Sequence, residues 1–266
     1  MARSKARVPV GPVLALGVLV AVSGCGSGGA QGGAAESGAP RPARSSAPPS
    51  PVSAPGLTEA QAHAALITEQ DLGEPWSPTK GAATWRDGML KATVEQQDCR
   101  RLMDALYTEE FFGPDVRPRA VTGLDDDWDG AQIRYQILAP PPQDVDRTLE
   151  WLASLPSKCA EFTAVTATGA RQHVWVSAFD ELPEAGDARQ GLRIVLTAPG
   201  GEDGEDGEDG EESALTVDLV AVRVGEDALV FTNGGLGEVP AEATWATADI
   251  GARRLEEVRK QGRAQV

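Results

Sequence analysis

Two alternating stretches, LRIVL at residues 192–196 and LTVDLVA at residues 215–221, decide the fold class of this chain. Large apolar residues occupy every second position in both, which is the period of a strand with one buried face. The same alternation occurs at Ile133–Ile137 and Val174–Ala178, and the apolar run Ala228–Thr232 ends at an Asn-Gly-Gly turn signal. The last four strands follow one another without a helical pattern, so they predict an antiparallel meander and not βαβ units.

Helical spacing of apolar residues appears in four further segments, at about residues 58–69, 99–106, 144–155 and 243–260. Thr58 with Gln61 three residues later is a capping-box pattern that begins the first helix. Asp98 is the expected N-cap of the second helix. The chain is therefore predicted to be α+β, with an antiparallel sheet of about five or six strands and helices packed mainly on one face.

The N-terminal segment carries a targeting pattern. Arg3, Lys5 and Arg7 are basic, and residues 8–22 then carry no charge. That run is shorter than the roughly 20 apolar residues of a membrane span, so it is typical of a secretion signal. The small residues directly before Cys25 resemble the lipobox of bacterial lipoproteins.

The lipobox resemblance implies a signal peptide at residues 1–24, cleavage after Gly24, and a lipid with acyl chains such as palmitate on Cys25. It places the protein on the extracytoplasmic face of the cell membrane, where the lipid on Cys25 supplies the membrane contact. The alternative is an ordinary secretory signal in which the cysteine is incidental.

Composition divides the rest of the chain into a linker and a domain. Residues 25–56 are mostly Gly, Ala, Ser and Pro and predict a disordered tether, because they have too few large apolar residues to form a core. Residues 57–266 are of a length typical of one domain. The whole chain has a formal net charge of −16, which argues against nucleic acid and anionic headgroups as partners of the folded part.

The chain has three cysteines. If Cys25 carries the lipid, Cys99 and Cys159 are the only possible pair, and outside the cytosol such a pair is expected to be oxidised to a disulfide. A shared metal is the rival interpretation, but two isolated cysteines without a nearby histidine do not make a zinc site. We expect the disulfide and no cofactor.

One motif suggests a metal. Asp125, Asp127 and Asp129, followed by a glycine, match the opening of an EF-hand calcium loop. The twelfth position is Gln136 instead of the bidentate glutamate, and the residues after the motif follow a strand pattern. A solvated acidic turn is the favoured interpretation, and calcium binding is the alternative hypothesis.

Catalytic motifs have little support. Ser77-Pro78-Thr79-Lys80 matches S-x-x-K, the nucleophile motif of penicillin-binding enzymes, but a glycine follows at once and no K-T-G motif occurs downstream. His63 and His173 are the only histidines, and no G-x-S-x-G, H-E-x-x-H or P-loop motif is present. The acidic repeat at residues 201–212 predicts a solvated loop without a mechanistic role. We therefore expect no enzymatic activity.

A family resemblance rests on four features in a fixed order. They are Asp71–Trp76 after a first helix, Cys99 opening the next helix, a helix running from Trp151 to Cys159, and a late apolar strand before a final amphipathic helix. Over roughly residues 57–262 this arrangement resembles the extracellular sensor domain of PknH-like mycobacterial kinases and related actinobacterial lipoproteins. The resemblance implies two disulfides, whereas this chain has cysteines for one in that region, and it transfers no ligand residue.

The predicted function is therefore that of a lipid-anchored extracytoplasmic binding or sensor-like module, which recognises a cell-envelope ligand or protein. An envelope lipoprotein with a structural or assembly role is the alternative, and a cell-wall hydrolase is the third possibility. The six tryptophans are expected mostly to fill the core, although aromatic side chains that line a cleft would suit sugars or apolar ligands.

Overall fold

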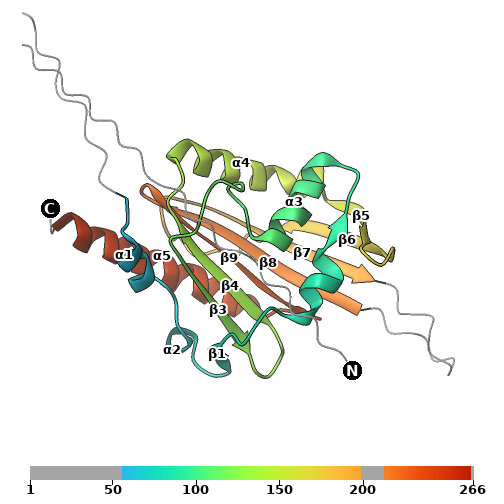
Figure 1. Cartoon of the computed structure of the whole chain (residues 1–266), viewed down its shortest axis with the longest axis horizontal. Coiled ribbons are helices and arrows are strands. Elements are labelled where there is room, and N and C mark those ends of the chain that lie inside the picture. The colour runs from blue at the N-terminus through green and yellow to red at the C-terminus, as the bar shows by residue number, and fades with distance from the viewer. Residues whose placement is uncertain (1–55, 199–212, 265–266) are drawn as a thin grey trace, which may run out of the picture. The chain divides into compact units, whose positions relative to one another are not determined.

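A nine-stranded, fully antiparallel sheet forms the centre of the computed structural model, which describes residues 56–198 and 213–264 (Figure 1). The strands are β1 (Trp76–Pro78), β2 (Ala92–Thr93), β3 (Ala120–Asp126), β4 (Gln132–Leu138), β5 (Glu161–Thr166), β6 (Arg171–Ala178), β7 (Ala188–Ala198), β8 (Ser213–Val224) and β9 (Asp227–Leu236). Their order across the sheet is β1-β3-β4-β9-β8-β7-β6-β5-β2. The predicted meander is confirmed, because β6, β7, β8 and β9 are sequential antiparallel neighbours.

The prediction of about five or six strands is wrong. The additional strands are β1, β2, β3 and β5. β1 and β2 contain only three and two residues, too few to show a period, and β3 combines a glycine with an acidic end. Such segments become strands through pairing with partners distant in sequence, as β2 does with β5.

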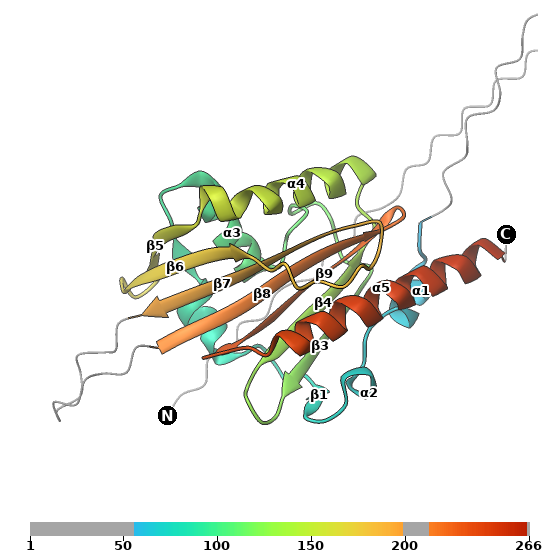
Figure 2. The ribbon, with the colours of Figure 1, turned by 180° about the vertical axis from the view of Figure 1, so that it is seen from behind.

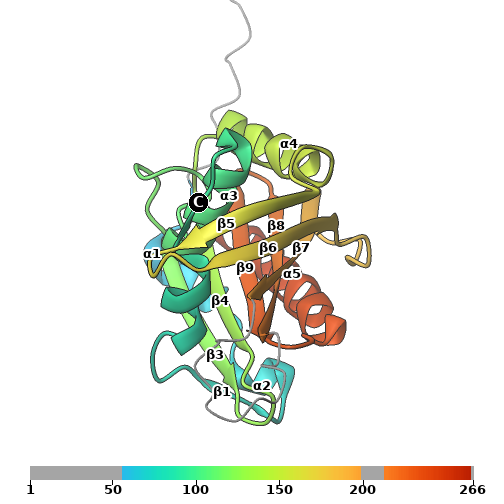
Figure 3. The ribbon, with the colours of Figure 1, turned by 90° about the vertical axis from the view of Figure 1, so that its right-hand side faces the viewer.

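Helices cover both faces of the sheet, so the prediction of helices mainly on one face is also wrong. The helices are α1 (Glu59–Ala64), α2 (Glu69–Leu72), the π-helix η1 (Arg86–Leu90), α3 (Gln97–Thr108), α4 (Pro142–Lys158) and α5 (Ala241–Ala264). η1, α3 and α4 pack into one core, and α1 and α5 pack into a second core on the opposite face (Figure 3). α5 contacts β8 and β9 across this second face (Figure 2).

The reason for two covered faces lies in β8. Leu215, Val217 and Leu219 enter the core of α3 and α4, whereas Val220 and Val222 enter the core of α5. A strand with apolar residues at adjacent positions is buried on both sides and needs a helical layer on each. The alternation visible at residues 215–221 therefore described only one of the two buried faces.

The predicted helices are confirmed in place, with different ends. Thr58 and Gln61 form the expected capping box, but α1 ends at Ala64, and a second capping box of Thr68 and Asp71 begins α2. Asp98 is not the N-cap of α3, because that position is Gln96. The chain leaves the helical path between α1 and α2, where Leu66 turns its carbonyl group to accept a hydrogen bond from Arg254 of α5.

One ion pair and one close contact hold α5 in position. The Arg254 guanidinium donates to both carboxylate oxygens of Asp71. Burial opposes ionisation of Asp71, but hydrogen bonds from Arg254 and Thr68 outweigh it and lower the pKa of this carboxyl group. Gly251 allows the helix to lie against Tyr135, since a Cβ atom at residue 251 would be only 2.6 Å from the Tyr135 hydroxyl oxygen. That hydroxyl group is buried without a hydrogen-bond partner in the described part of the chain, and burial raises the pKa of Tyr135.

Candidate functional site

The predicted disulfide between Cys99 and Cys159 is present. It joins the first turn of α3 to the residue after α4, and both cysteines are buried. Lys158 and Asp98 add an ion pair of 3.1 Å beside it. The lipid site predicted at Cys25 lies outside the described residues, as do the signal peptide, most of the tether and the acidic repeat at residues 201–212.

The three aspartates of the calcium motif do not form a common ligand set. Asp125 in β3 accepts hydrogen bonds from the Gln132 side chain at 2.7 Å and from the Lys80 amide at 3.2 Å. The neighbouring Asp126, the last residue of β3, accepts hydrogen bonds from the amides of Trp128 and Asp129 in the following turn. Within residues 56–198 and 213–264, no group of three or more His, Cys, Asp or Glu residues could hold a metal ion. The calcium hypothesis therefore gains no support from this geometry.

The S-x-x-K match is a coincidence of sequence. Ser77 lies in strand β1 and not at a helix N-terminus, and its buried hydroxyl group has no hydrogen-bond partner among the residues that the structure describes. The arrangement that would return Lys80 to the serine one helical turn later is therefore absent here.

The prediction that most tryptophans fill the core is only partly confirmed. Trp85 and Trp151 are buried, Trp76 is partly buried, and Trp128, Trp175 and Trp245 are exposed. Trp175 stacks on His173 within β6, with ring centroids 5.9 Å apart.

Two clusters of buried charge are satisfied internally. Glu109 accepts a hydrogen bond from Arg134 at 3.0 Å and forms an ion pair with Arg86, also at 3.0 Å. Asp218, which is fully buried, accepts two from Arg193, at 2.7 and 2.8 Å. Hydrogen bonding to Asp218 raises the pKa of Arg193, so the guanidinium group stays charged. Because these groups already have partners, we assign them to stability and not to ligand binding.

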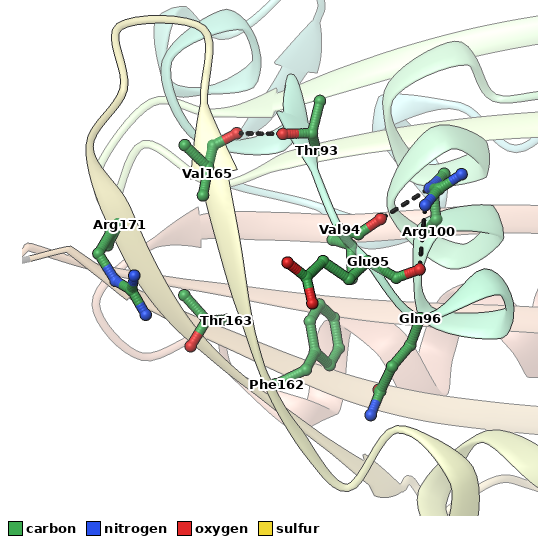
Figure 4. Close-up of a pocket in the computed structure, with 9 residues that line it drawn as sticks. All are labelled: Thr93, Val94, Glu95, Gln96, Arg100, Phe162, Thr163, Val165 and Arg171. Carbon is green, nitrogen blue, oxygen red and sulfur yellow. Dashed lines mark hydrogen bonds between the residues drawn. The ribbon is translucent and has the colours of Figure 1, made fainter.

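A groove lies at the β2 edge of the sheet, and its polar groups are not all paired with one another. It has a volume of about 580 Å³, within the usual range for ligand sites. Its lining comes from β2 and the following turn, the start of α3, β5 and the start of β6 (Figure 4). The lining residues are Thr93, Val94, Glu95, Gln96, Arg100, Phe162, Thr163, Val165 and Arg171. We call this the β2–β5 groove.

Backbone groups on one wall of the β2–β5 groove have no strand partner among residues 56–198 and 213–264. β2 pairs with β5 only at Val165 and Thr166, and then the chain turns away to begin α3. The ends of the β5–β6 ladder bond through Ala160 and Thr166, so the even-numbered residues of β5 direct their backbone groups to β6. Glu161 and Thr163 consequently direct their amide and carbonyl groups outward, beyond the end of β2.

Local interactions fix the other wall. Arg100 in α3 donates to the carbonyl oxygen of Val94 at 2.7 Å and to that of Glu95 at 3.0 Å. The Thr93 hydroxyl group donates to the carbonyl oxygen of Val165 at 3.3 Å, which ties β2 to β5. These hydrogen bonds connect the turn after β2 to α3, and β2 to β5, next to the outward edge of β5.

Two charged side chains in the β2–β5 groove have no ion-pair partner in the described part of the chain. Glu95 and Arg171 are exposed, and neither forms an ion pair with any residue in the described part of the chain. They lie on opposite sides of β5: Glu95 is drawn with Phe162 on the α3 side, and Arg171 with Thr163 and Val165 on the other (Figure 4). The groove thus offers a negative group, a positive group and free backbone groups within one recess.

Sequence reasoning did not find this groove. The alternation of Phe162 and Ala164 with polar residues in EFTAVT would have indicated β5, since both side chains are buried. No sequence signal marks the two-residue strand β2, so the free edge beyond it could not be anticipated.

Comparisons with known proteins give matches among solved structures. No protein-family model matches the sequence, and no curated protein matches it. The crystal structure of the extracellular domain of PknH from Mycobacterium tuberculosis is similar over 77% of this chain and 97% of that domain, with 13% sequence identity and a TM-score of 0.46. A likeness at this level does not establish a common function.

The described part of the chain includes no helix with the length and apolar character needed to cross a bilayer.

Proposed function

We propose that this protein is a lipid-anchored, extracytoplasmic binding module and that the β2–β5 groove is its binding site. The signal-like segment before Cys25 supports the location, and so does the Cys99–Cys159 disulfide, because such bonds persist in oxidising compartments. The observation that carries the binding role is the set of uncommitted groups in the groove. Glu95, Arg171 and the outward backbone groups of Thr163 share one recess, whereas the other buried charge clusters use their charges internally.

These groups suit recognition by hydrogen bonds and charge, and the proposal involves no catalytic step. A ligand that reaches the groove must offer acceptors and donors to the β5 edge, and a complementary charge to Glu95 or Arg171. An envelope protein or a soluble envelope ligand could both be reached by a domain attached to the membrane through a tether.

Photo-crosslinking in intact cells tests the binding site. A photoreactive amino acid replaces Glu95 in one variant and Trp128 in a control variant. Trp128 is 75% exposed and lies in the β3–β4 turn, near the opposite edge of the sheet. We expect adducts from position 95 that are missing from position 128. The same adducts from both positions, or none from position 95, would refute the binding site.

The anchoring part of the proposal is tested separately. Metabolic labelling with an alkyne fatty acid should mark the wild-type protein, and the Cys25→Ala variant should lose the label and remain unprocessed or leave the membrane fraction. An unlabelled wild-type protein, or a Cys25→Ala variant that is processed and retained like the wild type, would contradict lipid anchoring. The domain should fold equally well in both proteins.

A further inference from the structure

We infer that the occupant of the β2–β5 groove is an extended segment of a partner polypeptide, which adds to the sheet as a strand along the free edge of β5. The inference rests on the proposed function and specifies the chemical class of its ligand. Its basis is the backbone of β5, and the side chains around the groove then set which segments fit.

The β5 edge presents donors and acceptors in the pattern of an unpaired strand. Thr163 and Glu161 lie two residues apart, and each directs an amide and a carbonyl group outward. An extended peptide can satisfy all of these groups at once, because its own amides and carbonyls have the same repeat. A compact small molecule would satisfy one or two of them and leave the others unpaired.

The groove admits one strand and does not favour association of two copies. β2 blocks the edge at Val165 and Thr166, and the turn Val94–Gln96 forms a wall on the α3 side. The free stretch of β5 is therefore short and recessed, unlike the long flat edges that cause aggregation. Two copies of this chain, each with a net charge of −16, also repel one another.

Side chains around the free edge predict which segments are preferred. In an added strand, a residue opposite Thr163 would direct its side chain to the face that carries Arg171, since Thr163 and Val165 share that face with their β6 partners His173 and Arg171. The residues before and after it would direct their side chains to the other face, where Glu95 and Phe162 lie (Figure 4). We therefore expect an acidic residue flanked by basic or apolar residues.

A substitution at the free edge tests the mode of binding. Thr163→Pro removes the outward amide, which β6 does not use, so a proline is compatible with the strand at this position. Thr163→Ala is the matched control, because it removes the hydroxyl group and keeps the amide. The probe is a phage-displayed library of random heptapeptides, selected on the full-length protein purified in detergent.

We expect the selected peptides to alternate in charge as described, and to bind Thr163→Pro about tenfold more weakly or worse. Their affinity for Thr163→Ala should remain within about twofold of wild type. A library without binders, or selected peptides that bind the proline variant as well as the wild type, would overturn the inference. A wild-type dimer in light scattering that Thr163→Pro abolishes would assign the edge to a second copy, and would also overturn it.

A second variant keeps the test decisive if the proline variant does not fold. Arg171→Glu changes an exposed side chain and leaves the β5 backbone intact. Selection on this variant should favour a basic residue where the wild type favours an acidic one, and unchanged preferences would count against the inference. If adducts at position 95 persist in Thr163→Pro cells, the groove is a binding site but strand addition is wrong; if they never form, the proposed function itself fails.

Discussion

Removal of the Cys99–Cys159 disulfide should have the largest effect on stability of the substitutions considered below. The perturbation is the double substitution Cys99→Ala and Cys159→Ala, made in a Cys25→Ala background so that neither protein carries a free thiol. The bridge joins residues 60 positions apart. In the chain-entropy model, closing a loop of that length lowers the entropy of the unfolded chain by an amount that stabilises the folded state by about 4 kcal/mol. For a domain of this size the melting temperature should fall by roughly 8–16 °C.

Urea unfolding followed by tryptophan fluorescence measures the effect, because Trp85 and Trp151 are buried in the core that contains the disulfide. The Cys25→Ala protein is the reference for the double variant. A loss below about 1 kcal/mol would refute the reasoning, because the unfolded chain would then gain little freedom from removal of the bridge.

Four further substitutions test the contacts that hold α5 against the sheet and the ion pair of Asp218. Asp71→Asn weakens the charged hydrogen bonds from Arg254 and should cost about 2 kcal/mol at pH 7 in thermal melts. Folding lowers the pKa of Asp71, so this contribution is present above the unfolded-state pKa of about 3.9 and is lost as the pH falls through the folded-state value. Tyr135→Phe removes a buried hydroxyl group without a partner and should leave the free energy of unfolding unchanged or raise it by up to about 1 kcal/mol. Gly251→Ala should cost about 1–3 kcal/mol, because the new Cβ atom would lie 2.6 Å from that hydroxyl oxygen, and Tyr135→Phe should recover part of the loss. Asp218→Ala removes a fully buried carboxylate that accepts hydrogen bonds from Arg193 and Thr244, and should cost about 2–3 kcal/mol in urea unfolding.

Different results would contradict each of these expectations. If the difference in the free energy of unfolding between Asp71→Asn and wild type grew towards low pH, its pH dependence would be opposite to the one expected from the lowered pKa of Asp71. A Tyr135→Phe variant that loses more than about 1 kcal/mol would imply a partner for the hydroxyl group, such as a bound water. If the effects of Tyr135→Phe and Gly251→Ala on the free energy of unfolding simply add in the double variant, the steric clash is not the explanation for the loss.

The meander was predictable because its strands are long, and the alternation of apolar residues on one face of each strand is visible in the local sequence. Residues 192–196 and 215–221 show the period of a strand directly, and the Asn233-Gly234-Gly235 sequence suggested a turn close by. That turn signal misled in one respect, since β9 continues through these residues to Leu236. Pairing with β8 and β4 keeps the glycines extended, which shows tertiary contacts overriding a local preference.

The number of faces covered by helices could have been inferred from β8. Val220, Val222 and Val224 extend an apolar pattern on the positions that the first pattern leaves polar, and a strand that is apolar on both faces belongs between two layers. The order of the sheet could not be inferred in the same way. β4 reaches β9 across an intervening helix and four strands, and no residue in either strand specifies the other.

The candidate site depends on such long-range placement. Its two walls are separated by more than 60 residues, and neither shows a motif that sequence reasoning could use. The motifs that sequence analysis singled out lie near the other edge of the sheet. Asp125 is in β3, Asp127 and Asp129 are in the turn after it, and the serine of the S-x-x-K match is in the edge strand β1. Acidic or hydroxyl residues in a suggestive order are common on a surface, whereas an unpaired strand edge leaves no signature in composition.

The disulfide connects the two walls of the groove. Gln96 of the groove lies three residues before Cys99, and Phe162 lies three residues after Cys159, so the bridge joins the two walls at their base. A preorganised groove loses less entropy when it binds an extended peptide than a groove whose walls move independently. The double cysteine variant should therefore bind groove-selected peptides more weakly than the Cys25→Ala reference, even at temperatures where both proteins are fully folded. Equal affinities would show that Arg100 and the β2–β5 pairing hold the walls without help, and that the disulfide serves stability alone.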